Sequence, residues 1–336
     1  MKVSIILPCR NEDKYIERCL KSIIDTSYSK EELRVYVVDG FSTDRTRLII
    51  KRIKKEHPFI KLIDNPDKIT PIAVNLGLQA DDSDIKILMG AHSTIDRDFI
   101  SIAVEHLSRS PELGCVGGVI SNVNENAKAE VIALAMSSKF GVGNARFRTG
   151  GKDGYVDTVA FGAYRKEVFE KIGYLDIDLV RNQDDELNFR LVKNGFKIWL
   201  TQAIKSNYYV RGDYKKLLKQ YYQYGYWKVF VNKKHSTITS VRQLVPFFFV
   251  LFLLVNIVGS IFFEKVRLIL LLGLSSYFVA AFYFGLQKTR RPLMLFRLIK
   301  VFLILHLGYG VGYFMGLLWF VLLRKKPSDK SKSLSR

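Results

Sequence analysis

Short apolar runs alternate with helical patterns over the first two thirds of the chain. Four of these runs have the length and the bounding residues of buried strands: Val3 to Leu7, Arg34 to Val38, Ile60 to Ile63 and Ile85 to Met89. Because helical segments separate the first of them, the alternation predicts a doubly wound, mainly parallel, Rossmann-like α/β sheet. Ligands of such sheets bind beyond the carboxyl ends of the strands. Asp39 and His92 each follow one of these ends.

The alternation continues, less regularly, to about residue 235. A helix is predicted near Asp98 to Ser108, a strand at Gly114 to Ile120 and a helix over Asn126 to Phe140. Gly141 to Tyr155 is rich in glycine and arginine, which predicts a loop over the site. Strands are also predicted at Asp157 to Tyr164 and at Phe196 to Trp199. Helices are predicted at Lys166 to Ile172 and at Arg181 to Asn194, and an amphipathic helix at Tyr214 to Phe230.

From Leu244 onward the chain consists mostly of Leu, Phe, Val, Ile and Gly. Leu244 to Phe263 is about 20 residues without a charge, which is enough for a helix that crosses a bilayer. Val266 to Leu286 is similar, and Leu293 to Leu323 is longer but has basic residues near its start. We therefore predict a domain of residues 1–235, a membrane domain of about three hydrophobic helices in residues 236–326, and a disordered basic tail in residues 327–336.

The charges beside these segments bear on membrane topology. The first residues, MKVSIILPCRNE, turn polar too soon for a signal peptide, so the first domain is expected to stay in the cytosol of a multi-pass membrane protein. Basic clusters lie at Lys233-Lys234, Lys288 to Arg291 and Arg324 to Lys326. The positive-inside rule favours all three on the cytosolic side, which three simple crossings do not allow. Either the rule is broken at the C-terminus, or one segment is re-entrant or lies in the interface.

The overall composition narrows the classes of partner. A net charge of +20 suggests nucleic acid or an anionic membrane surface, and the basic groups beside hydrophobic segments favour the membrane. The sequence contains no nucleic-acid-binding motif, so we expect no nucleic acid as a partner. Cys9, Cys19 and Cys115 lack the spacing of a metal site and have the pattern of reduced cytosolic thiols.

Three consecutive acids, Asp184, Asp185 and Glu186, begin a predicted helix that ends at Gly195. Acids in a first helical turn interact favourably with the helix dipole, by roughly 0.3–1 kcal/mol each. That structural role is one interpretation of all three. The other is that Asp184 faces a cleft and accepts a proton.

Other candidate residues also have two interpretations. Asp39 is either a turn-forming residue before a glycine or an acceptor for a nucleobase N–H or a ribose hydroxyl. His92 is either a structural histidine or a metal ligand, and imidazole suits Mn²⁺ better than Mg²⁺. Arg146 and Arg148 either clamp a diphosphate or are solvated loop charges. The aromatic stretch Lys219 to Trp227 either packs against sugars or anchors at a membrane interface.

Taken together, these motifs resemble glycosyltransferase family 2, whose members have the GT-A fold. The motifs are SIILPCRNE from Ser4, VVDGFSTDRT from Val37, GAHSTI from Gly90 and QDDEL from Gln183. The sequence is most similar to the membrane-bound succinoglycan-biosynthesis type. This second resemblance also includes FGVGNARFR from Phe140, VDTVAFGAYRKEVFEKIG from Val156 and the KQYYQYG stretch from Lys219, and it covers nearly the whole chain.

The resemblance implies roles for individual residues. Asp184 matches the catalytic base, although Gln183 replaces the Glu that precedes it in many members. His92 occupies the last position of the DxD metal motif, whose first acid is replaced by Gly90, so the Mn²⁺ or Mg²⁺ site is weaker, altered, or completed by the diphosphate. The implied nucleotide-sugar-binding residues are Pro8, Arg10, Glu12, Asp39, Arg146 and Arg148. Residues implied near the acceptor or behind the site are Asp185, Glu186, Gln220, Gln223 and Tyr224, the last three aligning loosely with an element whose Arg and Trp are missing.

The function implied is an inverting, metal-dependent hexosyltransferase. It moves a sugar from a nucleotide sugar, a UDP-sugar rather than a GDP-sugar being favoured, to a hydroxyl of a lipid-linked glycan or polysaccharide precursor at the inner membrane face. Two alternatives remain, namely a polyprenyl-phosphate sugar synthase and a non-catalytic nucleotide-sugar-binding subunit of an assembly complex. A channel or transporter is disfavoured, because the hydrophobic part is small and lacks paired intramembrane charges.

Overall fold

The structure is a computed structural model, and it describes residues 1–210 and 212–327. The chain divides into two compact units. The first unit contains Met1–Asn122 and Arg146–Tyr209, and the second contains Val123–Ala145 and the chain from Val210 onward. In this division, residues 123–145 and 210–235 group with the apolar C-terminal helices.

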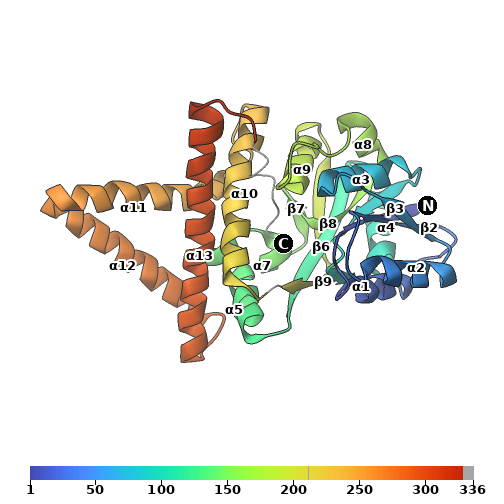
Figure 1. Ribbon diagram of the computed structural model, residues 1–336, viewed down its shortest axis with the longest axis horizontal. Helices are drawn as coiled ribbons and strands as arrows, with labels where there is room; N and C mark the ends of the chain where they lie inside the picture. The colour runs from blue at the N-terminus through green and yellow to red at the C-terminus, as the bar shows by residue number, and fades with distance from the viewer. Residues whose placement is uncertain (211, 328–336) are drawn as a thin grey trace. The chain divides into compact units, whose positions relative to one another are not determined.

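The first unit is built on a mixed sheet whose N-terminal part is parallel (Figure 1). Strands β1 (Val3–Cys9), β2 (Leu33–Asp39), β3 (Ile60–Asp64) and β4 (Ile85–Leu88) lie in the order β3-β2-β1-β4 and pair in parallel. The predicted parallel α/β core is therefore confirmed. The sheet continues from β4 through further strands, several of which pair antiparallel: β8 (Ala160–Arg165), β6 (Leu113–Asn124), β9 (Lys197–Val210), β5 (Ser93–Ile95) and, beside β9, β7 (Gly154–Val156).

Helices cover both faces of this sheet, so the run VSIIL in β1 is buried on both faces and its apolar residues do not alternate with exposed ones. Ile5 and Leu7 pack on one face, and Ile6 packs on the other. The first face is covered by helices α1 (Ile16–Ile24), α2 (Thr46–Glu56) and α4 (Phe99–Arg109). The second face is covered by α3 (Thr70–Gln79), α8 (Lys166–Ile172) and α9 (Gln183–Lys193).

The strand register brings candidate residues to one edge of the sheet. Cys9 pairs with Asp39, and Asp39 pairs with Asp64, so β1, β2 and β3 end at the same level. On the other side of β1, Leu88 at the end of β4 pairs with Ile6. The loops that follow β1, β2 and β4 therefore leave the sheet from one edge, as expected for ligand-binding loops of a parallel sheet.

Two regions differ from the prediction. The strand predicted to stop at Trp199 continues as β9 to Val210, where it pairs with β5, a strand that was not predicted. In its second half exposed polar residues interrupt the apolar positions, so the hydrophobic run ends before the strand does. The predicted loop Gly141 to Tyr155 contains the end of α6 (Lys139–Val142), the short helix α7 (Arg146–Thr149) and the first residues of β7.

The second unit is helical. It contains α5 (Ala127–Met136), α6, α10 (Tyr214–His235), α11 (Val245–Phe262), α12 (Glu264–Leu286) and α13 (Pro292–Gly316), which continues as a π-helix over Leu317–Leu322. In the described part of the chain, three helical segments are long and apolar enough to cross a membrane: Val241–Phe262, Glu264–Leu286 and Pro292–Leu322. The predicted hydrophobic helices are therefore confirmed by length and composition, whereas most of the tail 327–336 lies outside the described residues.

Helices α10 and α13 lie side by side in close contact (Figure 1). Glycines at a spacing of four, Gly308, Gly312 and Gly316, form the face of α13 that contacts α10. A Cβ atom on Gly312 would collide with the carbonyl oxygen of Tyr222, and one on Gly225 of α10 would collide with that of Tyr309. Small residues at this spacing let helix backbones approach closely, as in membrane helix pairs.

One histidine joins three helices of this unit. His306 of α13 lies 2.8 Å from the Tyr277 hydroxyl of α12 through Nδ1. Its Nε2 lies 2.8 Å from the carbonyl oxygen of Phe140 in α6. The Phe140 ring also contacts those of Tyr277 and Phe302. The short helix α6 is thereby fixed to the apolar helices by both hydrogen bonds and ring contacts.

Candidate active site

The three acids at the start of α9 have different environments. Glu186 is buried, and its two oxygens accept hydrogen bonds from Arg190 one turn later, at 2.7 and 3.0 Å. Arg190 also donates to the carbonyl oxygens of Ile172 and Tyr174, so this pair ties α9 to the end of α8. Asp184 instead is exposed, and its Oδ1 accepts a hydrogen bond of 2.9 Å from the backbone N–H of Asp185. Of the three, Asp184 has the accessibility that a proton acceptor requires.

Asp184 is an exposed residue, and nearby protein atoms partly desolvate its carboxyl group. This desolvation raises the pKa of Asp184, and the neighbouring carboxylate of Asp185 raises it further. The guanidinium of Arg148 acts in the opposite direction and lowers this pKa. A carboxylate with a raised pKa is a better proton acceptor near neutral pH than an ordinary aspartate.

A buried polar network surrounds Asn188, which lies one turn after Asp184 in α9. Asn188 is fully buried, and its Oδ1 accepts a hydrogen bond of 2.9 Å from the Tyr164 hydroxyl in β8. Its Nδ2 donates to Thr158 Oγ1 at 2.8 Å. Because every partner is supplied by the sheet or the loop before it, the network fixes the start of α9, and with it Asp184, on the sheet.

His92, Tyr208 and Arg148 form a second cluster near the carboxyl end of β4. The β5–β9 pairing places Tyr208 opposite Ser93, and the Tyr209 N–H donates to the His92 carbonyl oxygen at 3.1 Å. The rings of His92 and Tyr208 meet edge to face with centroids 4.9 Å apart. The Arg148 guanidinium carbon lies 5.6 Å from the centre of the same tyrosine ring. Tyr208 therefore links the candidate metal ligand to the arginine that acts on Asp184.

Three residues at this position have a buried polar atom that lacks a hydrogen-bond partner among the described residues. These atoms are His92 Nδ1, Arg148 Nη1 and Gln183 Oε1. Leaving a buried donor or acceptor without a partner costs about 1–3 kcal/mol, and more when the group is charged. The set contains a donor, Arg148 Nη1, and an acceptor, Gln183 Oε1, so a ligand that completes it would need both an oxygen that accepts and a hydroxyl or N–H that donates.

The two loop arginines have different roles in the structure. Arg146 donates to the carbonyl oxygens of Lys152 and Tyr155, and so closes the turn that leads into β7. Arg148 keeps Nη1 without a partner and acts on Asp184. Both residues were predicted to clamp a diphosphate. The geometry favours Arg148 for that role, because the Arg146 side chain is already engaged with the backbone.

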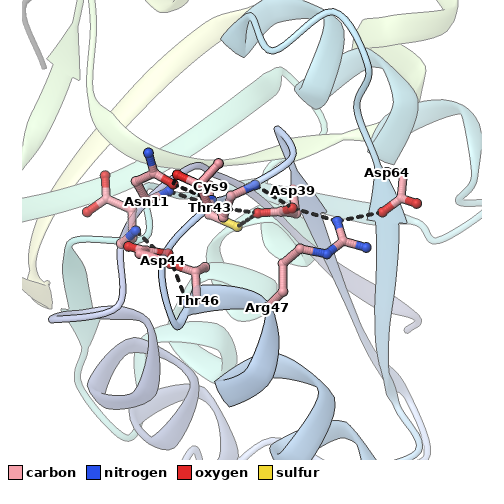
Figure 2. A network of polar contacts seen from close by, with 10 residues as sticks. Cys9, Asn11, Asp39, Thr43, Asp44, Thr46, Arg47 and Asp64 are labelled. Atoms are coloured by element: carbon pink, nitrogen blue, oxygen red, sulfur yellow. Dashed lines mark hydrogen bonds and ion pairs between the residues drawn. The ribbon is translucent and has the colours of Figure 1, made fainter.

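Asp39 lies at the centre of the network in Figure 2, and its side chain is fully buried. Its Oδ1 accepts hydrogen bonds from Ser42 Oγ at 2.5 Å and from Cys9 Sγ at 3.8 Å. Its Oδ2 accepts them from the Ser42 N–H at 3.1 Å and from Arg47 Nη1 at 2.6 Å. Arg47 continues to Asp64 Oδ1 at 2.8 Å. A nucleobase or ribose donor would have to replace one of these partners before it could bind Asp39.

The loops after β1 and β2 are joined by hydrogen bonds (Figure 2). Asn11, which has a positive φ of 54°, accepts from the Thr43 N–H at 2.8 Å through Oδ1. Thr46 Oγ1 accepts from the Glu12 N–H at 2.8 Å. These bonds position Glu12, which is buried, with Oε1 3.7 Å from His92 Nδ1. Arg10 is half-buried beside Gly40, and Pro8 is half-buried in β1.

The residues present fit a divalent metal only in part. Within the described residues, no group of three or more His, Cys, Asp or Glu side chains could hold a metal ion. His92 Nδ1 has no hydrogen-bond partner among the described residues, so it could bind a metal, and the nearby Glu12 supplies a carboxylate. This pair would supply one nitrogen and one carboxylate to a divalent metal, which is fewer than a complete set of ligands.

The predicted acceptor residues of the aromatic stretch belong to a different unit from Asp184. Gln220, Gln223 and Tyr224 belong to the second unit, in α10, where Gln220 Nε2 donates to the Tyr224 hydroxyl at 3.0 Å. Sequence reasoning did not identify Tyr208 or Asn188. Tyr208 lies in the part of β9 that the apolar pattern did not predict. The helical spacing of four from Asp184 is a signal that could have identified Asn188.

Comparison with known proteins identifies the family. The family model described as Glycosyl transferase family 2 matches residues 4–173. A Methanococcus voltae protein named dolichyl N-acetyl-alpha-D-glucosaminyl phosphate 3-beta-D-2,3-diacetamido-2,3-dideoxy-beta-D-glucuronosyltransferase is 33% identical over 326 residues, which are 94% of this chain and 97% of that protein. Succinoglycan biosynthesis protein ExoA of Rhizobium meliloti (strain 1021) is 32% identical over 244 residues, which are 72% of this chain and 73% of ExoA.

Solved structures agree on the fold. The mannosyltransferase PcManGT from Pyrobaculum calidifontis, solved with GDP-Man and Mn²⁺, has a TM-score of 0.61 at 17% identity and covers 94% of this chain and 87% of its own. TarS 1–349 of S. aureus with UDP-GlcNAc has a TM-score of 0.54 at 18% identity and covers 69% of this chain and 65% of its own. The GT-A resemblance drawn from the motifs is thus confirmed. The chain belongs to glycosyl transferase family 2 and is a glycosyltransferase.

Proposed function

We propose that this enzyme transfers a sugar, with inversion, from a nucleotide sugar to a hydroxyl of a lipid-linked saccharide at the inner face of a membrane. The observation that carries the proposal is the grouping of the accessible, raised-pKa carboxyl of Asp184 with the unpartnered atoms of Arg148, Gln183 and His92. The lipid-linked acceptor is supported by the name of the Methanococcus voltae relative, which spans nearly the whole chain, and by the three apolar helices.

The proposed step is a single displacement. The acceptor hydroxyl oxygen attacks the anomeric carbon while Asp184 takes the hydroxyl proton. The bond from that carbon to the diphosphate oxygen breaks, and its electron pair leaves with the nucleoside diphosphate. Arg148 is positioned to stabilise the charge that develops on the diphosphate, because its Nη1 is buried and free of other partners among the described residues. His92 and Glu12 are the residues that would hold a divalent metal, which would supply further positive charge for the same leaving group.

The donor is proposed to be a UDP-sugar or a GDP-sugar. Related structures carry nucleotides of both kinds, since TarS was solved with UDP-GlcNAc and PcManGT with GDP-Man. The nucleoside is assigned to the loops after β1 and β2, where Arg10, Glu12 and Asp39 lie at one edge of the sheet. Gln220, Gln223 and Tyr224 are kept as candidates for the acceptor side, and Asp185 as a residue that tunes Asp184.

The test is a transfer assay with the full-length enzyme in detergent or lipid. A panel of UDP- and GDP-sugars is combined with Mn²⁺ or Mg²⁺ and a membrane lipid extract, and release of nucleoside diphosphate is followed together with formation of glycosylated lipid. We expect release with one donor, dependent on the lipid extract. Binding of a nucleotide sugar without release under all conditions would contradict catalysis and favour a non-catalytic subunit.

The acid limb of the pH profile is expected to lie above the ordinary range of an aspartate. Since Asp184 acts in its deprotonated form and its pKa is raised, kcat/KM falls as the pH is lowered through that raised value. Replacing Arg148 with Gln removes the charge that lowers this pKa, so the limb should move to still higher pH. The measurement is kcat/KM against pH for both forms, with His92→Gln as a control for titration of the imidazole. A limb at the ordinary pKa of aspartate, unmoved in the Arg148 variant, would exclude this role for Asp184.

Restoring an acid at position 90 should strengthen metal binding. Gly90 does not adopt a positive φ, and a Cβ atom there lies 3.8 Å from His92 Cε1 and from Phe161 Cε1, so a side chain fits. For Gly90→Asp, we expect affinity for Mn²⁺ to rise about tenfold in the presence of UDP, because one more carboxylate raises the ligand charge. Titration calorimetry measures both Mn²⁺ and Mg²⁺, and the gain should be larger for Mg²⁺, which prefers oxygen ligands. Gly90→Ala is the steric control, and equal affinities in all three proteins would place the metal elsewhere.

A further inference from the structure

The helices α10 and α13 run in the same direction along each other. At their beginnings, the Lys300 ammonium lies over the Tyr214 ring, 5.5 Å from its centre. Near their ends, Asn232 Nδ2 donates to the Tyr313 hydroxyl at 3.1 Å, and Lys233 Nζ donates to the Phe320 carbonyl oxygen at 2.6 Å. The two helices are therefore parallel neighbours over nearly the whole length of α10.

The helices α11 and α12 leave this pair and return to it (Figure 1). The first turn of α11 packs at the middle of α13, where the Pro246 carbonyl oxygen closes on Gly310. At its other end Ile261, Phe262 and Phe263 are 74%, 72% and 64% exposed. Along the way α11 packs on α12, with Gly259 against Val266 and Phe252 against Gly273. Helix α12 then brings the chain back to α13, where Gly285 packs against Leu295.

We propose that α11 and α12 alone cross the bilayer, as a hairpin, and that α10 and α13 lie along the membrane surface on the side on which the chain begins. The chain then crosses twice, and Arg324 to Lys326 return to the side on which the chain begins. The occupant of the exposed apolar surface of α11 and α12 is the hydrocarbon of the bilayer. This arrangement extends the membrane placement in the proposed function, but it does not depend on sugar transfer.

The direction of α10 excludes a crossing by α13. If α13 spanned the bilayer, α10 would lie beside it at the same depth and would span it too, in the same direction. Successive crossings alternate in direction, so with α10, α11, α12 and α13 all crossing, the fourth would run opposite to the first. The structure has them parallel. In addition, α11 would then start at mid-bilayer and its far turn, next to Glu264 and Lys265, would end in hydrocarbon, where charges are unfavourable.

The charges agree with the hairpin. Lys233-Lys234, Lys288 to Arg291 and Arg324 to Lys326 all come to the same side, which satisfies the positive-inside rule for every cluster. Helix α13 keeps an apolar exposed face that includes Phe296, Val311 and Met315, together with basic residues near its start, as in helices that lie in a membrane interface. Its greater burial than α11 or α12 follows from its contacts with α10 and the hairpin.

The test is labelling of single cysteines by a membrane-impermeant maleimide, in right-side-out and inside-out vesicles from cells that make the full-length chain. Cys9, Cys19 and Cys115 are buried, so the unmodified chain sets the background. The variants are Lys54→Cys in α2, Lys265→Cys at the hairpin turn, Arg290→Cys before α13 and Lys326→Cys after it, all exposed positions. Labelling after permeabilisation verifies that each cysteine reacts.

We expect positions 54, 290 and 326 to label from one side and position 265 from the other. Labelling of position 326 together with position 265 would overturn the proposal in favour of three crossings, and labelling of position 265 together with position 54 would overturn the hairpin. The labelling pattern can be measured in an inactive protein, so its outcome is separate from that of the transfer assay. If position 54 labels from the outside, the cytosolic placement fails, while positions 54 and 326 still decide the number of crossings.

A matched pair of variants tests depth independently. Val311 in α13 is 40% exposed and Val255 in α11 is 60% exposed. Val255→Lys is expected to place a charge in hydrocarbon and to reduce the recovery of assembled protein severalfold. The lysine of Val311→Lys should reach the membrane surface, so this variant is expected to be tolerated. Equal loss in both variants, or no loss in either, contradicts the arrangement.

Discussion

Asp184→Asn is expected to reduce the rate of sugar transfer by about 10²- to 10⁴-fold, the usual contribution of a general base. Asparagine keeps the shape of the side chain and can still accept the Asp185 N–H bond, but it cannot take up the acceptor proton. The substitution removes the ability to take up a proton but keeps the packing of the side chain. We therefore expect the KM for the donor and the melting temperature to change little. The measurement is kcat and KM from nucleoside diphosphate release at saturating acceptor.

Asp185→Asn is the matched control for this experiment. It removes a negative charge one residue away, which should lower the pKa of Asp184 and shift the acid limb downward while leaving substantial activity. An Asp184→Asn enzyme with near-normal kcat on a hydroxyl acceptor would contradict the base assignment. If that enzyme were active only on a lipid phosphate, the polyprenyl-phosphate sugar synthase would replace the proposed function, since a phosphate is already a nucleophile.

Arg148→Gln is expected to lower kcat by about 10²- to 10³-fold, the range found when one group that stabilises developing charge is removed. Its Nη1 lacks a hydrogen-bond partner among the described residues, so the substitution breaks no hydrogen bond of that atom, although it removes the contact of the guanidinium with the Tyr208 ring. The measurement is single-turnover transfer together with the affinity for the nucleoside diphosphate, which should weaken in parallel.

Arg146→Gln provides the contrast within the same short helix. Its guanidinium already binds the Lys152 and Tyr155 carbonyl oxygens, so its loss should loosen the turn and lower the melting temperature with a much smaller effect on kcat. The opposite order of effects, with kcat lost in the Arg146 variant and kept in the Arg148 variant, would reverse the two assignments. Equal losses would indicate that the loop, rather than one charge, is required.

Much of the catalytic fold could be predicted because its signals are local. The run VSIIL is apolar except for Ser4 and predicts a buried strand, which the structure shows to be parallel. The helix predicted from Lys166 to Ile172 has the same bounds in the structure. The long strand β9 was missed because its second half owes its structure to pairing with β5, which no local pattern reveals. Tyr208 was missed with it, since its importance comes from the side chains that tertiary structure brings to it.

The site residues themselves stay predictions, as does the boundary at residue 235. The sequence does not reveal which of two similar residues already forms hydrogen bonds within the fold. Arg146 and Arg148 look equivalent in the motif FGVGNARFR, as do Asp184 and Glu186 in QDDEL. Only the hydrogen bonds separate them, because each depends on backbone atoms and side chains that are distant along the chain.

The bond from His306 to the Phe140 carbonyl oxygen has a consequence for handling the enzyme. It fixes α6 to α12 and α13, and Arg146 follows the end of α6 within four residues. We expect a detergent that loosens the apolar helices to release α6 in a local opening that leaves the sheet intact. A protein altered in this way should still show a native far-ultraviolet spectrum, so that spectrum alone is an insufficient check of a detergent preparation.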